Sequence, residues 1–194
     1  MFRGFGLLML TLWSVTGTAQ WRGGYLSFLP RMEEAGYTYR DAAGAPIDDV
    51  PTWMATQGMN LARYRIWNDP EDGPHHALPD VLREAQRMHA AGMDILLDFH
   101  FSDTWADPGN KTLPGAWEGM SFQAVKGTMA CHVRCALQVL EARGAPPAMV
   151  QLGNEINPGM MWPHGALDNG FDALSDLLQA GSDVVHEVFP ECTV

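Results

Sequence analysis

The sequence is poor in positive charge. It contains 12 Lys and Arg against 23 Asp and Glu, which gives a formal net charge of −11 at pH 7. Nucleic acids and anionic membranes bind basic surfaces, so this balance argues against both as partners and favours solubility. We therefore expect no nucleic-acid partner, and no membrane partner for the mature chain.

Long apolar runs are also lacking beyond the N-terminus, where none reaches the ~20 residues of a membrane-spanning helix. Residues 1–19 combine a positive Arg3, an apolar run from Phe5 to Val15 and small residues up to Ala19, which is typical of a signal peptide. A short membrane anchor is the less favoured alternative, because the run has only about half the required length. We expect a signal peptide at 1–19, a mature chain at 20–194 and a secreted protein, extracellular or periplasmic.

Cysteine is scarce and odd in number: Cys131, Cys135 and Cys192. Cys131 and Cys135 are four residues apart in a helical pattern, where their side chains run side by side and are poorly placed for a mutual disulfide. We expect all three to be buried small hydrophobic residues. The alternative is a disulfide partner outside residues 1–194.

Nucleotide and metal signatures are missing as well. Arg22-Gly23-Gly24 precedes the first expected strand instead of following it, so it is not a phosphate-binding loop. His75-His76 lies in a loop with prolines and has no third ligand at metal-site spacing, so we expect a solvated pair. The sequence predicts no cofactor and no metal.

What the sequence does contain is a globular composition, 46% hydrophobic, and a regular alternation of strands and helices. Strands are expected at 25–29, 61–67, 95–100 and 149–152, with another beginning at 192, and helices at 30–35, 48–57, 78–91, 122–143 and 171–188. This order predicts a parallel sheet covered by helices. Polar residues follow three successive strands instead of one switch point, which favours a (β/α)8 TIM barrel over an open sheet.

The strand at 149–152 leads directly into Gly153, Asn154 and Glu155. A carboxyl that can protonate a leaving oxygen, beside an amide that can hold a ring hydroxyl, suits sugar chemistry. The alternative is a solvated turn. Arg63 and Arg65 are two residues apart in their strand and therefore share one face. We expect at least one of them to meet a carboxylate because an unpaired buried cation is costly.

Tryptophans gather in the loops that follow the strands: Trp105, Trp117 and Trp162. Indole rings stack on the C–H faces of sugars, so tryptophans near carboxylates favour a polysaccharide cleft, although one of the three is expected to cap the core. His100 ends its strand either as a satisfied core histidine or as a site residue.

Residues 98–108 read DFHFSDTWADP and resemble the D-F-H-Y-S-D-T-W-A-D-P signature of glycoside hydrolase family 53, the arabinogalactan endo-β-1,4-galactanases. Arg63-Tyr64-Arg65-Ile66-Trp67 resembles that family's R-x-R-V-W segment. Gly153-Asn154-Glu155-Ile156 matches its G-N-E-I motif, and Met161-Trp162-Pro163 is similar to its L-W-P. The resemblance covers residues 22–194.

The resemblance implies a secreted (β/α)8 enzyme that cuts internal β-1,4-galactosyl bonds of pectic galactan with retention. Glu155 would then be the general acid/base, Asn154 would hold the sugar 2-hydroxyl, and Arg65 would hydrogen-bond the nucleophile. Four further residues would line the substrate subsites: His100, Asp103, Trp105 and Trp162. Retention needs two carboxyls about 5–5.5 Å apart, one of them kept protonated.

Two departures from the family pattern stand out. Tyr25 occupies the position of an aspartate in the family's R-G-x-D-x-S segment. The family's nucleophile is a glutamate on strand seven, whereas residues 20–194 are expected to supply only the first four βα units of the barrel and no nucleophile. Such a half barrel has open edges that favour self-association. The rival hypotheses are a catalytically inactive galactan-binding fragment and a related hydrolase of the same clan acting on another β-linked glycan.

Overall fold

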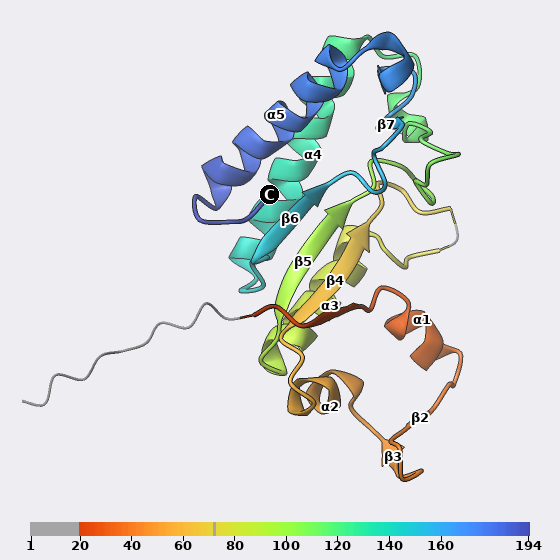
Figure 1. Cartoon of the computed structure of the whole chain (residues 1–194), viewed down its shortest axis with the longest axis vertical. Helices are drawn as coiled ribbons and strands as arrows, with labels where there is room; N and C mark the ends of the chain where they lie inside the picture. Colours follow the sequence, from red (N-terminus) through yellow and green to blue (C-terminus); the bar gives the residue numbers. More distant parts are fainter. Residues whose placement is uncertain (1–19, 72) are drawn as a thin grey trace, which may run out of the picture.

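The computed structural model describes residues 20–71 and 73–194, and the expected signal peptide at 1–19 lies outside them. Its centre is a four-stranded parallel sheet in the order β1-β4-β5-β6 (Figure 1). The strands are β1 (Gly23–Tyr25), β4 (Leu61–Ile66), β5 (Asp94–Phe99) and β6 (Met149–Leu152). This is the arrangement of the first four βα units of a (β/α)8 barrel, as predicted.

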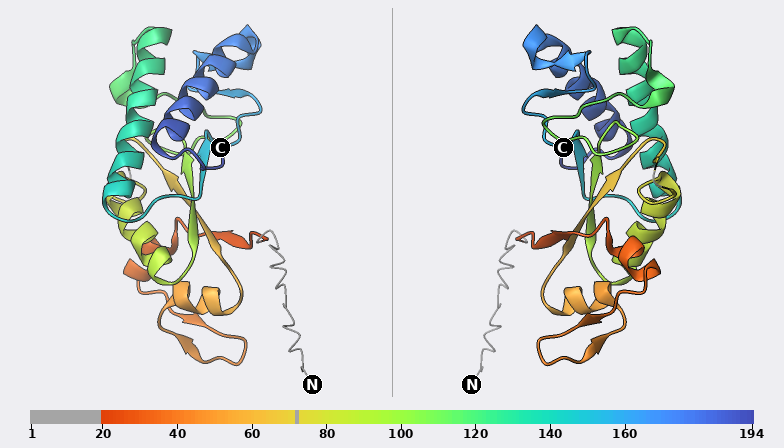
Figure 2. Two further views of the ribbon diagram at one scale, coloured as in Figure 1. Left: turned by 90° about the vertical axis from the view of Figure 1, so that its left-hand side faces the viewer. Right: turned by 90° about the vertical axis from the view of Figure 1, so that its right-hand side faces the viewer.

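Five helices connect the strands: α1 (Leu29–Glu34), α2 (Val50–Thr56), α3 (Leu78–Ala90), α4 (Phe122–Ala142) and α5 (Asp172–Val188). Seen edge-on, α3, α4 and α5 lie on the same side of the sheet (Figure 2). The connections contain two short antiparallel strand pairs: β2 (Tyr39–Arg40) with β3 (Pro46–Ile47), and β7 (Gly159–Met160) with β8 (Gly165–Ala166). Two 3-10 turns, η1 (Gly115–Trp117) and η2 (Leu167–Asn169), complete the chain.

Strand alternation divides the sheet into two unlike faces. The helix-covered face carries buried apolar side chains on each strand, among them Ala62, Tyr64, Ile66, Ile95, Leu97, Phe99, Val150 and Leu152, and these form the core. The opposite face carries Arg63 and Arg65 on β4, Asp98 on β5 and Gln151 on β6. The polar face lies where a closed barrel would have its interior.

Two expectations need correction. The first strand is Gly23–Tyr25 and not 25–29, because these residues pair with Leu61–Arg63 before the chain turns into α1. Cys131 and Cys135 are exposed, with their Sγ atoms 3.9 Å apart, and only Cys192 is buried. The buried stripe of α4 runs through Val125, Met129, Val133, Ala136, Leu137 and Leu140, which puts both cysteines on the solvent side.

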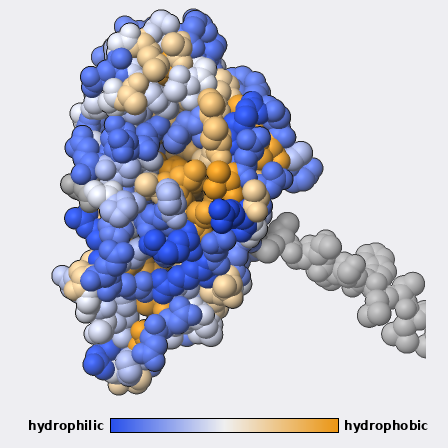
Figure 3. All heavy atoms as spheres, turned by 180° about the vertical axis from the view of Figure 1, so that it is seen from behind, coloured by the Kyte–Doolittle hydropathy of each residue, from blue (hydrophilic) through white to orange (hydrophobic). Residues whose placement is uncertain are grey.

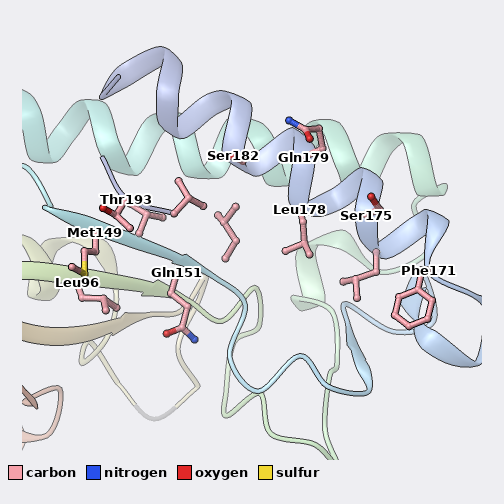
Figure 4. A pocket seen from close by; sticks show the side chains of 13 residues that line it. Leu96, Met149, Gln151, Phe171, Ser175, Leu178, Gln179, Ser182 and Thr193 are labelled. Carbon is pink, nitrogen blue, oxygen red and sulfur yellow. The ribbon is translucent and has the colours of Figure 1, made fainter. Parts of the chain in front are cut away.

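An apolar groove of about 770 Å³ lies between β6 and α5. Its walls include Leu96 and Met149 from the sheet and Leu178 and Phe171 from the α5 side (Figure 4). Beside it, Thr193 forms a parallel bridge with Met149, which matches the expected start of another strand. The groove follows the edge of β6, which Thr193 pairs only near its amino end.

The surface seen from behind is largely hydrophilic and carries a hydrophobic area near its middle (Figure 3). In the part of the chain that the structure describes, no helix has the length and apolar character needed to cross a bilayer.

Candidate active site

The carboxyl ends of β4, β5 and β6 bring the expected site residues to one edge of the sheet. The strand register aligns Arg65 with Asp98 and Asp98 with Gln151, and the chain then continues from β6 into Asn154 and Glu155. Parallel strands deliver their carboxyl ends to the same rim, which is where βα barrels place their functional groups.

Arg63 joins all three strands. Its Nη2 donates to Asp98 Oδ2 at 2.6 Å, to Asn154 Oδ1 at 2.9 Å and to Gln151 Oε1 at 3.2 Å. The Asp98 side chain has no solvent exposure, so the guanidinium supplies the charge that this carboxylate needs. The expectation that one of the two arginines meets an acid is confirmed for Arg63.

Asn154 is buried and fully oriented by its neighbours. Its Oδ1 accepts from Arg63, and its Nδ2 donates to the carbonyl of Ala106 at 2.8 Å. The amide is therefore fixed in one rotamer at the rim of the sheet. The role expected for it, holding a sugar hydroxyl, stays a prediction.

Glu155 is exposed and has a backbone φ of 49°, in the left-handed region that non-glycine residues seldom occupy. Gly153 precedes it with a φ of 89°, and a Cβ there would lie 2.6 Å from Ile156 Cγ2. Gln151 Nε2 donates to the Gly153 carbonyl at 2.8 Å. A tight, hydrogen-bonded turn thus presents an exposed carboxylate beside a buried amide.

Arg65 lies in a box of aromatic rings. Its guanidinium carbon is 4.0 to 5.6 Å from the ring centres of Tyr25, Phe28, Trp67 and Trp105. Its Nη1 donates to the Tyr25 hydroxyl at 2.7 Å, and burial lowers the pKa of Arg65. Within residues 20–71 and 73–194 its Nε has no hydrogen-bond partner. This Nε is itself buried, so Arg65 has one unsatisfied donor in this structure.

The second polar contact of Arg65 is His76, whose Nε2 lies 2.5 Å from Arg65 Nη2. Burial, and next the charge of Arg65, lowers the pKa of His76 to about 3, so the ring is neutral and accepts the N–H. The prediction of a solvated His75-His76 pair is therefore wrong for His76, which is 2% exposed. The loop after β4 folds back over the arginine, which sequence spacing alone did not reveal.

His100 is buried beneath this edge and makes contacts that orient it. Its Nδ1 accepts from Trp67 Nε1 at 3.1 Å, which leaves Nε2 to donate to Asp98 Oδ2 at 3.0 Å. The imidazole therefore supports the buried carboxylate in this structure. Its side chain has no exposed surface here, and the expected contact of His100 with substrate stays a prediction.

Asp103 fastens two loops together, because its Oδ1 accepts from the Asp69 N–H at 2.8 Å and its Oδ2 from the Gly115 N–H at 2.7 Å. Both oxygens have protein partners, so a substrate contact by Asp103 stays a prediction.

The tryptophans divide as expected into surface and core. Trp105 is 38% exposed and Trp162 is half-buried at the same end of the sheet, whereas Trp117 is 5% exposed and packs in the core. Trp117 contacts the ring of His132 on α4. The sequence alone did not identify which of the three belongs to the core.

Sequence reasoning missed several participants. The role of Asp98 was not predicted from the sequence, although alternation along β5 puts it on the same sheet face as Arg63 and Arg65. Tyr25 was noted only as a departure from the family pattern, yet its hydroxyl binds Arg65. In the described residues, no group of three His, Cys, Asp or Glu side chains gathers as a metal site.

The parallel βα sheet and the polar groups at the carboxyl ends of its strands define a βα-barrel protein. Residues 21–194 match the model of glycosyl hydrolase family 53. The chain belongs to this family.

Relatives in sequence and in structure agree with this assignment. The chain is 35% identical over 176 residues to an uncharacterized protein of Niallia circulans, covering 87% of this chain and 48% of that protein. It is 34% identical over 164 residues to arabinogalactan endo-beta-1,4-galactanase A of Aspergillus niger, covering 84% and 45%. The chain thus spans about half the length of the curated relatives it matches.

Two solved structures have the same architecture. The GH53 catalytic domain of Ignisphaera aggregans superposes with a TM-score of 0.82 at 35% identity, covering 88% of this chain and 49% of that one. A fungal beta-1,4-galactanase gives 0.81 at 29% identity, covering 87% and 49%.

Proposed function

We propose that this chain is the acid/base half of a secreted, retaining endo-β-1,4-galactanase that hydrolyses internal bonds of pectic galactan. The observation that carries the proposal is Glu155, an exposed carboxylate on a left-handed turn beside the buried Asn154. This pairing occurs in a family whose named relatives are arabinogalactan endo-β-1,4-galactanases.

In this proposal Glu155 donates a proton to the leaving glycosidic oxygen and then, as a carboxylate, takes one from the attacking water. Asn154 holds the sugar hydroxyl beside the bond that breaks. Arg65 offers its free Nε to the nucleophile, and Trp105 and Trp162 stack on sugar rings.

The second carboxyl of a retaining pair is not assigned to this chain. Asp98 is an acidic candidate at the end of β5, but its Oδ2 is already bound by both Arg63 and His100. We therefore propose that the nucleophile is not among the residues that the structure describes.

The test is to bind and digest linear β-1,4-galactan with the purified chain and three variants. Affinity electrophoresis should show that Trp105→Ala weakens galactan binding about tenfold, in line with losing 1 to 2 kcal/mol of stacking. The exposed Trp53 on α2 provides the matched control, and Trp53→Ala should bind like the unmodified chain. Glu155→Gln should still bind and should abolish any hydrolysis.

The outcomes bear on the rival hypotheses in different ways. Galactan binding without hydrolysis is expected both for a half that lacks the nucleophile and for a binding fragment, whereas sustained hydrolysis by the unmodified chain contradicts the absence of a nucleophile. Preference for another β-glycan in a polysaccharide panel favours a different substrate within the clan. No binding to any glycan contradicts the proposal.

We further propose that residues 1–19 direct secretion and that copies of this chain self-associate through the groove between β6 and α5. The groove is lined largely by apolar residues and follows a sheet edge that Thr193 pairs only in part. Both features favour burial against another surface.

A further inference from the structure

Lys111 is a buried lysine in the loop after β5, and no role proposed above uses it. It is 2% exposed. The sequence contains only one other lysine, Lys126. Burying an ammonium is unfavourable unless polar partners compensate, so the contacts of this residue indicate what it does.

Lys111 contacts the Glu155 segment at two points. Its Nζ lies 2.5 Å from the carbonyl oxygen of Asn154, which belongs to the peptide bond that joins Asn154 to Glu155. Its own backbone carbonyl accepts from the N–H of Trp162 at 2.8 Å, and Thr112 forms a parallel bridge with Trp162. One short stretch thus fastens both the Glu155 peptide and the Trp162 loop to the end of β5.

The backbone of Glu155 requires such support. A non-glycine residue at a φ of 49° is strained by about 1 to 3 kcal/mol and keeps that conformation only where its surroundings hold it. A hydrogen bond to the carbonyl just before Glu155 fixes the orientation of that peptide plane. The contact therefore acts on the torsion that aims the Glu155 side chain.

The charges around the Lys111 ammonium also indicate Glu155 as its partner. Burial lowers the pKa of Lys111 below its ordinary value of 10.5, and the carboxylates of Glu155, Asp107 and Asp98 oppose the shift, Glu155 most strongly. Asp98 is paired with Arg63, so its charge is already compensated. Glu155 is therefore the carboxylate to which Lys111 is most strongly coupled.

We propose that Lys111 is the positioning residue for Glu155: its ammonium holds the Asn154 carbonyl and so maintains the turn that presents the Glu155 carboxylate. The acid/base role of Glu155 rests on the proposed function. The contact between the Lys111 ammonium and the Asn154 carbonyl does not. Lys111 acts through the backbone and is not assigned a contact with substrate.

The two lysines make the test direct. NMR titration of lysine-labelled chain follows both ammonium groups, and Lys126, which pairs with Asp176 at the surface, is an internal reference. We expect Lys111 to titrate below 10.5 and Glu155→Gln to lower its pKa by a further half unit or more, roughly, because the opposing charge is gone. Glu118→Gln, an exposed glutamate of the same loop, should leave Lys111 unchanged.

A second measurement tests positioning. Backbone couplings that report φ at Glu155 should move away from the left-handed region in Lys111→Met and return toward it in Lys111→Arg, which restores the cation and donor. If the Lys111 variants do not fold, the titration still decides, because Glu155 is exposed and Glu155→Gln leaves the core intact.

The proposal is overturned if Lys111 titrates at its ordinary value or does not respond to Glu155→Gln. Galactan binding decides the proposed function separately. A chain that shows the Lys111–Glu155 coupling but binds no galactan supports the positioning role and removes only the substrate assignment.

Discussion

Asp98 is a carboxylate with no solvent exposure, and Arg63 is the cation that makes this tolerable. Three hydrogen bonds of Arg63 Nη2 also tie β4 to β5 and β6. At the scale of single residues, the candidate site therefore depends on one guanidinium that serves both stability and the orientation of Asn154.

Removing that guanidinium leaves a buried carboxylate unpaired. Arg63→Met should lower the free energy of unfolding by roughly 3 kcal/mol in urea titrations at pH 7. The control is Arg134→Met, which removes a surface pair with the exposed Glu187 and should change stability little. Equal losses in the two variants would contradict the assigned role of Arg63.

Tyr25 occupies a position where the family pattern has an aspartate, and its hydroxyl accepts from Arg65. Tyr25→Phe keeps the ring against Arg65 and removes only this bond, so we expect a loss of about 1 kcal/mol in unfolding free energy. Tyr37→Phe, at a tyrosine that is 61% exposed, is the matched control and should be neutral. A neutral Tyr25→Phe would mean that the ring contacts and His76 hold Arg65 without this hydrogen bond.

At the scale of elements, the turn after β6 is the most constrained segment of the site. Gly153 combines a positive φ with a close approach to Ile156, so Gly153→Ala should destabilise by about 2 to 3 kcal/mol. Gly44 has a similar φ of 85° but no atom within 4 Å of an added Cβ, so Gly44→Ala should cost only about 1 kcal/mol. Thermal unfolding of the two variants separates crowding from backbone strain, and equal losses would show that crowding is absent.

Helix α4 contains an acid-sensitive group. Burial lowers the pKa of His132 from 6.5 to about 4, so between these values the unfolded chain binds more protons than the folded chain. Stability should therefore fall as the pH drops from 6.5 to about 4.

His132→Phe removes this titration. Urea unfolding at pH 7 and pH 4.5 should show a smaller acid-induced loss in this variant, by on the order of 2 kcal/mol. His186→Phe, at an exposed histidine on α5, should retain the full loss. An unchanged loss in His132→Phe would contradict the assignment.

The sequence predicted most elements because their periodicity is strong. β6 coincides with the expected strand at 149–152. The strands β4 and β5 and the helices α3, α4 and α5 differ from their expected bounds by at most a single residue at either end. The two-residue strands β2, β3, β7 and β8 were not predicted, since a pair of residues has no periodicity. The prediction that Cys131 and Cys135 are buried is wrong because it rested on the apolar character of cysteine, whereas the apolar stripe of α4 lies on another side of the helix.

The site was predicted in part. Asn154 and Glu155 were found because they follow a strand directly in sequence, and Arg65 because alternation puts it on the polar face. His76 and Lys111 reach the same rim from loops that fold back over it. Such contacts depend on loop conformation, which a single sequence does not specify.

At the scale of the whole molecule, the groove between β6 and α5 predicts self-association. Light scattering across a dilution series should detect assemblies that Leu178→Asp converts to monomers, because Leu178 lines the groove. Val139→Asp, on the exposed face of α4, should not change the assembly. Because each copy carries a net charge of −11, association should strengthen with salt. A chain that is monomeric at every concentration contradicts the proposal.

The polar network around Arg63 has a consequence for how this sequence can diverge over generations. Arg63, Asp98, Gln151 and Asn154 come from different strands and segments, yet Arg63 donates a hydrogen bond to each of the other three. A change at one of these positions leaves its partners unsatisfied, so lineages should keep or replace the four together. Covariation among homologous sequences should link these positions more strongly than it links neighbouring positions on the solvent side of α4.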